Sequence, residues 1–313
     1  MSKNFIFLFF ALILLLTTTV LAVQHCDGRG GCDCDCGWAT ADSCKNDDGS
    51  CCFGCCCGSS PGPGPSPPGP TPGPLDTYCP SANDLTAAYG NPQIFDQGWT
   101  FSGGGAAATK AAFNLLGGSV EFDFDVSGVR PGVNSNIYTI SPSGVGSGGF
   151  NQNNYCDGAK PAGSQWCVEV DWIESNGNCG GQTTLHDIPG PGSNGCTAWG
   201  CASSYHYNGK ASFHMKVTFD TNGVWNTYRD GQLISPSSMS PSPSGSDWAT
   251  LVQQYSQRGA VIYSSQWVGW VPVSDCGSQS GDLGASTFSV KNLRIIGSVL
   301  QGPTPRKCNG FLA

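Results

Sequence analysis

The sequence predicts an all-β main domain over residues 76–313, built as a sandwich of two antiparallel sheets of the jelly-roll type. Many short segments are rich in Val, Ile, Phe, Tyr and Trp, and clusters of Gly, Asn, Pro and Ser separate them. Only Ser246–Arg258 has the spacing of a helix, with apolar residues at i, i+3, i+4 and i+7: Trp248, Leu251, Val252 and Tyr255. Many strands with almost no helix favour two packed sheets.

The clearest strand is Ser119–Val126, where apolar and polar residues alternate. Its sequence SVEFDFDV places Val and Phe on one face and acidic side chains on the other. Further strands are predicted at Cys167–Ile173, Ser212–Asp220, Trp225–Asp230, Ala260–Ser264 and Thr287–Ile296. The dipeptide Asp230-Gly231 predicts a hairpin turn after the fourth of these segments.

Residues 1–22 have the features of a secretory signal peptide. Lys3 precedes an apolar run from Phe5 to Leu16, and small residue Ala22 marks a plausible cleavage point. The run is shorter than the roughly 20 apolar residues that span a membrane. We therefore expect a secreted, extracellular protein whose mature form has no membrane segment.

Two further segments precede the main domain. Residues 23–57 hold ten cysteines and are too few to build an ordinary apolar core, so cross-links must stabilise this module. Residues 58–75 form a linker rich in Pro, Gly and Ser, which favours an extended, semi-stiff spacer. A small module on such a linker can bind a polysaccharide and raise the effective concentration of the main domain at an insoluble surface, so we expect polysaccharide binding. A structural knot and a device for cross-linking chains are the alternatives.

The eighteen cysteines indicate disulfide bonds, because exported proteins fold in an oxidising compartment. Zinc is the alternative reading of Cys34-x-Cys36 and Cys52-x-x-Cys55. Only one histidine, His25, stands beside the cysteine-rich module, so we predict disulfides and expect neither a metal nor a cofactor.

The charge balance argues against nucleic acid as a partner. The chain has 14 Lys+Arg against 22 Asp+Glu, a formal net charge of −8, and an acidic surface repels a phosphate backbone. Charged residues are only 12% of the chain, which is common among proteins that bind neutral polymers. A monomer that acts on a polysaccharide is the expectation.

The most informative segment is Cys167–Asn176, which carries three acidic residues. Glu169 and Asp171 share one face of a strand because the side-chain period is two. Glu174 lies five positions from Glu169, and regular alternation would place it on the opposite face. A β-bulge between Asp171 and Glu174 would bring all three acids to one side.

Three ionised carboxyl groups on one face repel one another, and this raises their pKa values and costs stability. Such a cluster is expected where a function uses the raised pKa values. Retaining glycoside hydrolysis is such a function, because it needs an ionised nucleophile and a protonated acid about 5–5.5 Å apart. Asp171 could keep the titrations of Glu169 and Glu174 apart. A calcium site or a solvated acidic strand is the alternative that spacing alone leaves open.

The motif Glu169-x-Asp171-x-x-Glu174, followed by Ser175-Asn176, resembles the signature of glycoside hydrolase family 7, the cellobiohydrolases and endoglucanases. The laminarinase-type family 16 shares the same bulged core. Further blocks similar to family 7 occur in the same order: Phe113–Ser127, Pro131–Asn134, Ile137-Tyr138, Val261–Trp267, Thr287–Arg294 and Ile296–Ser298. The resemblance implies a concanavalin A-like jelly roll that acts on β-1,4-glucan, or on mixed-linkage or β-1,3-glucan through family 16.

The resemblance also implies roles for individual residues. Glu169 matches the nucleophile, Glu174 the acid/base and Asp171 the assisting acid. His186 stands where the family has a histidine about a dozen residues after the acid/base, although a solvated side chain is the alternative. Trp267 matches a strand tryptophan on which sugars stack. Trp172, Trp199 and Trp270 are further candidates for stacking on sugar rings. Trp172 alternates with the acids along the strand, so a position in the core is the favoured alternative for it.

The sequence departs from family 7 at several points. The stretch before Phe113 is short, Pro131 replaces a family cysteine, and Val268-Gly269-Trp270 replaces the acids that follow the strand tryptophan. These losses imply that tunnel-forming loops are missing and that the cleft is open. A lectin-like binder and a wall or coat protein on the same fold are the alternatives to a hydrolase.

Overall fold

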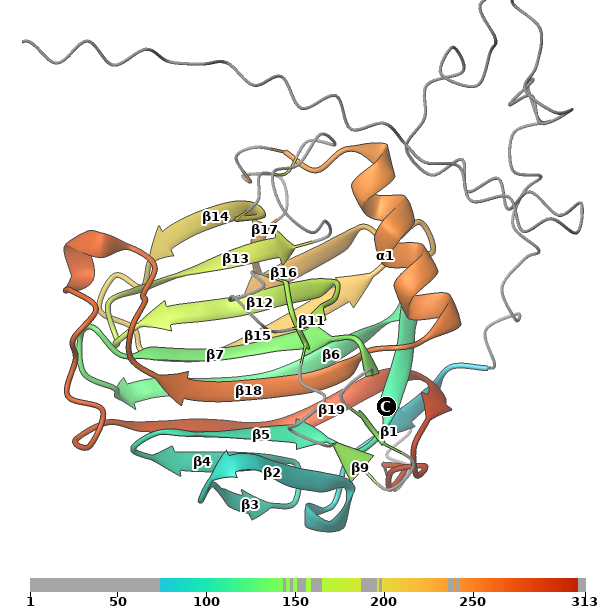
Figure 1. The fold of residues 1–313 in the computed structure, drawn as a ribbon, viewed down its shortest axis with the longest axis horizontal. Coiled ribbons are helices and arrows are strands. Elements are labelled where there is room, and N and C mark those ends of the chain that lie inside the picture. Colours follow the sequence, from blue (N-terminus) through green and yellow to red (C-terminus); the bar gives the residue numbers. More distant parts are fainter. Residues whose placement is uncertain are drawn as a thin grey trace, which may run out of the picture. The chain divides into compact units, whose positions relative to one another are not determined.

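The computed structural model describes residues 74–142, 145–146, 149–150, 156–158, 165–186, 196, 199–235, 239 and 242–308. The signal peptide, the cysteine-rich module and all but the last two residues of the linker, predicted at 1–22, 23–57 and 58–75, lie outside this part. Figure 1 shows the described residues as two layers of strands with one α-helix, as the sequence predicted.

One layer is an eight-stranded antiparallel sheet. Its order is β17 (Gln232–Ser235), β16 (Trp225–Arg229), β15 (Ser212–Phe219), β6 (Ala112–Gly128), β19 (Thr287–Gln301), β4 (Gly98–Ser102) and β3 (Gln93–Phe95), with β1 (Asp76–Tyr78) paired to β19. The long strands β6 and β19 pair along most of their length and form the centre of this sheet (Figure 1).

The other layer is a seven-stranded antiparallel sheet. Its order is β14 (Cys201–His206), β13 (Gly180–His186), β12 (Glu169–Asn176), β7 (Asn134–Ile140), β18 (Val261–Trp267), β5 (Gly105–Thr109) and β2 (Leu85–Gly90). Two short pairs accompany the sheets, β8 (Val145–Gly146) with β9 (Gly149–Phe150) and β10 (Cys156–Asp157) with β11 (Gln165–Trp166). Two short 3-10 helices complete the elements, η2 (Ala82–Asp84) and η5 (Ser274–Cys276).

Apolar side chains from the inner faces of both sheets form the core. Trp172 of β12 stacks on Phe122 of β6 with ring centroids 6.0 Å apart, and Phe124 contacts Phe288 of β19 at 4.8 Å. All four side chains are fully buried. The core therefore joins strands that are distant in sequence, and the all-β two-sheet prediction is confirmed.

The helix α1 (Gly245–Gln257) lies where the periodicity predicted a helix. Leu251 and Tyr255 are buried, and the Tyr255 hydroxyl shares a 2.7 Å hydrogen bond with Thr139 of β7. Burial without a charged partner raises the pKa of Tyr255 above its usual range, so the phenol stays neutral. The helix is thus fixed to the core by its apolar face and by one buried hydroxyl pair.

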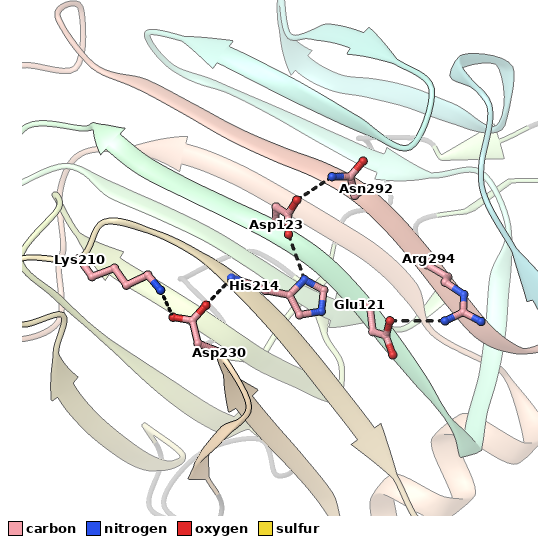
Figure 2. Close-up of polar contacts among 7 residues, drawn as sticks. All are labelled: Glu121, Asp123, Lys210, His214, Asp230, Asn292 and Arg294. Carbon is pink, nitrogen blue, oxygen red and sulfur yellow. Dashed lines mark hydrogen bonds and ion pairs between the residues drawn. The ribbon is translucent and has the colours of Figure 1, made fainter. Parts of the chain in front are cut away.

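The outward face of β6 carries the acidic side chains that the alternating pattern predicted. Figure 2 shows Asp123 between His214 and Asn292, and Glu121 beside Arg294. Glu121 also pairs with Lys216 at 3.0 Å. These carboxylates face solvent. Glu121 pairs with Lys216 of β15 and Arg294 of β19, and Asp123 contacts His214 and Asn292 of the same two strands.

Most predicted strands start or end within a few residues of the observed ones, and two differences are informative. The strand predicted at Cys167–Ile173 begins at Glu169 and continues to Asn176, because the ladder with β7 extends past the bulge as far as Asn134. Strand β19 extends five residues beyond the predicted Ile296. At the β16–β17 hairpin, Asp230 and Gly231 have φ of 47° and 80°, as a type I′ turn requires.

Four disulfides confirm the cysteine prediction for the eight cysteines of the described part. They are Cys79–Cys308, Cys156–Cys167, Cys179–Cys276 and Cys196–Cys201. Among the described residues, one group has the spacing of metal ligands, namely Cys179, His206 and Cys276. Its two sulfurs are joined in a disulfide, so they offer no thiolate to a metal. No helix in the described part is long and apolar enough to cross a membrane.

Candidate active site

The strand β12 contains the bulge that the sequence predicted. Asp171 pairs with Thr184 and Glu174 with Gln182, so three steps along β12 match two along β13. The same shift occurs against β7, where Asp171 pairs with Tyr138 and Glu174 with Asn136. One extra residue in β12 therefore separates Asp171 from Glu174 in both ladders.

The bulge changes which side chains enter the core. Val170, Trp172 and Ile173 are all fully buried in the main core cluster, although Trp172 and Ile173 are consecutive. The three acids therefore lie together on the opposite face of the seven-stranded sheet. This confirms the prediction that Glu174 returns to the face of Glu169, and it assigns Trp172 to the core rather than to a sugar platform.

All three acidic residues are buried, with exposed fractions of 7% for Glu169, 2% for Asp171 and 8% for Glu174. Buried carboxylates need hydrogen-bond donors, because desolvation disfavours the ionised form. The residue after β10 and the neighbouring strands supply such donors to Glu169 and Glu174, and His186 of β13 lies beside Asp171. The donors differ in kind, and this gives the three carboxyl groups different chemical environments.

Glu169 accepts a backbone hydrogen bond. The N–H of Gly158 donates to Oε2 of Glu169 over 2.6 Å. Gly158 follows the short strand β10, which the Cys156–Cys167 disulfide ties to the residue two positions before Glu169. A Cβ atom at Gly158 would lie 2.9 Å from Cβ of Glu169, so the close approach requires glycine. A fixed N–H donor stabilises a carboxylate anion.

Asp171 contacts the histidine that the sequence singled out. Nε2 of His186 lies 3.3 Å from Oδ2 of Asp171, and the histidine side chain is 11% exposed. His186 belongs to β13 and pairs in register with Glu169, so it lies beside two of the three acids. The structure thus places His186 in the acidic cluster rather than on a solvated loop.

Glu174 has neutral amide donors from both neighbouring strands. Nδ2 of Asn134 donates to Oε1 over 3.3 Å, and Nε2 of Gln182 lies 3.5 Å from Oε2. Gln182 also donates to Thr184 over the shorter distance of 3.0 Å. Neither amide carries a charge, so neither favours the ionised form of Glu174 as strongly as a lysine or an arginine would.

The tryptophans predicted to bind sugar occupy different positions. Trp267 ends β18 opposite Asn134, the residue that donates to Glu174, and is partly buried. Trp270 is 39% exposed and follows three residues later. Trp199 is 75% exposed and precedes Gly200, where a Cβ atom would lie 3.1 Å from Nδ1 of His186. Trp267 and Trp199 are thus close in the fold to residues that contact the acids.

Sequence reasoning missed Gly158, Asn134 and Gln182, which donate to Glu169 or Glu174, and Asn136, which donates to Asn134. Asn134 and Asn136 alternate on β7, and both are nearly or fully buried. Buried asparagines at alternate positions of a strand were a signal that could have indicated a polar site on that face.

Comparisons with known proteins found no matching family model and no matching curated protein. Solved structures do match. The native endocellulase EGI of Humicola insolens is 15% identical, with a TM-score of 0.44 over 63% of this chain and 75% of that chain. An apo Crh5 transglycosylase is 14% identical, with a TM-score of 0.43 over 75% and 90%.

A third match is a cellobiohydrolase of family GH7 from Daphnia pulex. It is 13% identical, with a TM-score of 0.44 over 64% of this chain and 79% of that chain. At low identity, the solved structures that this chain resembles therefore include two cellulases and a transglycosylase.

Proposed function

We propose that this protein is a secreted, retaining β-glucan hydrolase with Glu169 as nucleophile and Glu174 as general acid and base. The observation that carries the proposal is the bulge in β12, which brings both glutamates and Asp171 to one face of the sheet. Retaining hydrolysis requires two carboxyl groups in one active site, of which the nucleophile is ionised and the general acid is protonated.

The donors around the two glutamates support this division of roles. Glu169 accepts a short bond from the backbone N–H of Gly158, which suits a carboxylate that must be ionised to attack. Two donors to Glu174 from the neighbouring strands, the side chains of Asn134 and Gln182, are neutral amides, which suits a group that alternates between acid and carboxylate.

The reaction then proceeds in two balanced steps. In the first, Glu169 attacks the anomeric carbon while Glu174 gives its proton to the departing glycosidic oxygen, which leaves a glycosyl ester on Glu169. In the second, Glu174 takes a proton from water, the water oxygen attacks the anomeric carbon, and Glu169 is released as the carboxylate. Asp171, paired with His186, keeps negative charge between the two glutamates and helps separate their titrations.

The proposed substrate is a neutral β-glucan, with a cellulose-like β-1,4-glucan first among the candidates through the sequence resemblance to family 7. Trp267, Trp199 and Trp270 offer ring faces on which the apolar side of a glucose unit can stack. The short chain before Phe113 supports an open cleft and internal cleavage. A monomer with a polysaccharide-binding module at residues 23–57 belongs to the same proposal.

A second candidate is a carbohydrate binder without catalysis. The observation that favours it is the small exposed fraction of both glutamates, because buried and hydrogen-bonded carboxylates can also serve to stabilise a sheet. In that case the protein would recognise a wall polysaccharide, or form part of a wall or coat, through its aromatic side chains.

Hydrolysis of soluble glucans by three matched variants separates these candidates. The chain has only three glutamates, Glu121, Glu169 and Glu174, so each can be changed to glutamine in turn. We expect Glu169→Gln and Glu174→Gln to lower kcat by about 10²–10⁴-fold, and Glu121→Gln, on the outer face of the other sheet, to leave it unchanged. Cello-oligosaccharides, mixed-linkage glucan and β-1,3-glucan are the substrates.

Full activity in either active-site variant would contradict the assigned roles. Binding of these glucans by the wild-type protein without release of reducing ends would favour the binder instead.

A further inference from the structure

A chain of hydrogen bonds crosses three strands of the seven-stranded sheet and ends on Glu174. The backbone N–H and the hydroxyl of Ser265 on β18 both donate to Oδ1 of Asn136, over 2.7 Å and 3.0 Å. Nδ2 of Asn136 donates to Oδ1 of Asn134 over 3.2 Å, and Nδ2 of Asn134 donates to Oε1 of Glu174 over 3.3 Å. Every member of the chain is at least nine-tenths buried.

The direction of this chain is fixed at its origin. A backbone N–H can only donate, so the group of Asn136 that faces Ser265 must be its oxygen. The amide nitrogen of Asn136 then faces Asn134, which must present its own oxygen in turn. The nitrogen of Asn134 is therefore the group that faces Glu174.

We propose that Asn136 is a positioning residue that acts through Asn134 to select which oxygen of Glu174 carries the proton. This inference rests on the proposed role of Glu174 as acid and base. An N–H donor binds the carbonyl oxygen of a protonated carboxyl more favourably than the hydroxyl oxygen. Oε1, which accepts from Asn134, is thus the carbonyl oxygen, and the proton resides on Oε2.

The second donor to Glu174 agrees with this selection. Nε2 of Gln182 lies 3.5 Å from Oε2, at the outer limit of a hydrogen bond, and its stronger bond goes to Thr184. Of these two amide donors, the one at Oε2 is therefore the weaker, which agrees with a proton on Oε2 that can pass to a glycosidic oxygen.

The titratable groups on this face of the sheet enter the test. In the described part of the chain they are Glu169 and Asp171 on β12, His186 on β13, His206 on β14, which pairs with Asp275, Tyr138 on β7, Tyr263 on β18 and Tyr89 on β2. Burial, its largest influence, raises the pKa of Tyr89 despite a hydrogen bond with Ser265, so this phenol stays neutral at ordinary pH. Among the described residues, Glu169, Asp171, His186 and His206 are the other acidic or imidazole side chains on this face of β12, β13 and β14.

Carbon-13 NMR of glutamate carboxyls tests the inference directly. Because the chain has three glutamates, protein labelled only in glutamate side-chain carboxyls gives three titrating signals, which the three Glu→Gln variants assign. Glu121 serves as the internal reference, since it lies on the outer face of the other sheet. The measurement reads Glu174 whether or not the protein hydrolyses a glucan.

Two substitutions at Asn136 change the chain of hydrogen bonds in different ways. Asn136→Leu keeps the branching and the number of side-chain heavy atoms and removes the donor, so Asn134 loses its fixed orientation. Asn136→Asp keeps the shape but offers only acceptors, which forces Asn134 to turn its oxygen toward Glu174. We expect the titration midpoint of Glu174 to rise by about half a pH unit or more in the first variant and by about one unit or more in the second.

The matched control is Thr139→Val on the same strand. Thr139 faces the core and bonds to Tyr255. This variant therefore loses a buried hydrogen bond of β7 and leaves the hydrogen bonds that lead to Glu174 in place. We expect a lower melting temperature and an unchanged Glu174 midpoint. In an active enzyme, the basic limb of the pH profile of kcat/KM should move to higher pH in both Asn136 variants, while KM stays the same.

The outcomes separate the two proposals. A titration midpoint of Glu174 that does not move in Asn136→Leu would overturn the positioning role. A shift in Asn136→Asp alone would not support it, because the added charge would explain that shift. Activity retained in Glu174→Gln would instead overturn the proposed function, and the NMR midpoints would still report whether Asn136 controls the carboxyl.

Discussion

Nε2 of His186 lies 3.3 Å from Oδ2 of Asp171, in a contact that runs diagonally between β13 and β12. Asp171 pairs in register with Thr184, whereas His186 pairs with Glu169. One imidazole therefore lies beside the assisting acid and the proposed nucleophile at once. Asp171 is only 2% exposed, so its contact with His186 helps to fix the position of a buried carboxyl group.

Removing this imidazole should weaken catalysis. In His186→Ala, Asp171 loses its contact with the imidazole, and we expect kcat to fall by about 10–100-fold with little change in KM, because small displacements of reacting groups are costly. The matched control is His214→Ala, which breaks a similar pair with Asp123 on the outer face of the other sheet (Figure 2). Steady-state kinetics on a soluble glucan measures both, and equal losses in the two variants would contradict the assignment.

The backbone donor to Glu169 predicts a strict requirement for glycine at position 158. In Gly158→Ala, the added Cβ would lie 2.3 Å from Cβ of His186, so the loop must shift and lengthen the 2.6 Å bond to Glu169. We expect kcat to fall by about a hundredfold.

A second glycine provides the comparison for that variant. Gly245 begins α1 and has open space around its Cα, so Gly245→Ala should keep full activity and slightly raise the melting temperature. If Gly158→Ala remained as active as Gly245→Ala, the N–H of Gly158 would have no part in the site.

The ion pairs on the outer face of β6 predict a loss of stability in acid. Burial, the largest single influence, pushes the pKa of Glu121 up, but the hydrogen bond and charge of Lys216, together with Arg294, hold that pKa below its ordinary value. A lowered folded-state pKa stabilises the protein above the unfolded-state value, and this contribution disappears as pH falls through the folded-state value. It is a partly exposed pair, so we expect about 0.5–1 kcal/mol.

Thermal melts at pH 6 and pH 3 measure this contribution. Glu121→Gln should be less stable than the wild type at pH 6, and the difference should vanish at pH 3. A difference that stays constant between the two pH values would show that the ion pairs contribute nothing.

The fold was predictable because its signals are local. Alternation in Ser119–Val126, the helical spacing of Ser246–Arg258 and the Asp230-Gly231 turn each lie within a few residues, and the structure confirms all three. Parity alone would place Glu169 and Glu174 on opposite faces, and the bulge in β12 was predicted because it brings the three acids to one face; the structure contains it.

The partners of the acids were not predictable in the same way. Asn134 lies 40 residues from Glu174 in sequence, and Ser265 lies 129 residues from Asn136. Those contacts depend on strand order and register, which the hydrophobic pattern of a single strand does not determine. Gly158 is 11 residues from Glu169, yet its role depends on a disulfide whose pairing the sequence left open.

Covalent trapping of the nucleophile tests the central claim most directly. A 2-deoxy-2-fluoro β-cellobioside with a good leaving group forms a long-lived ester on the nucleophile of a retaining enzyme, and mass spectrometry of the digested protein locates it. We predict one added glycosyl group on the peptide that contains Glu169, and none in Glu169→Gln. A label on another residue, or hydrolysis that releases the inverted anomer without any label, would contradict the account.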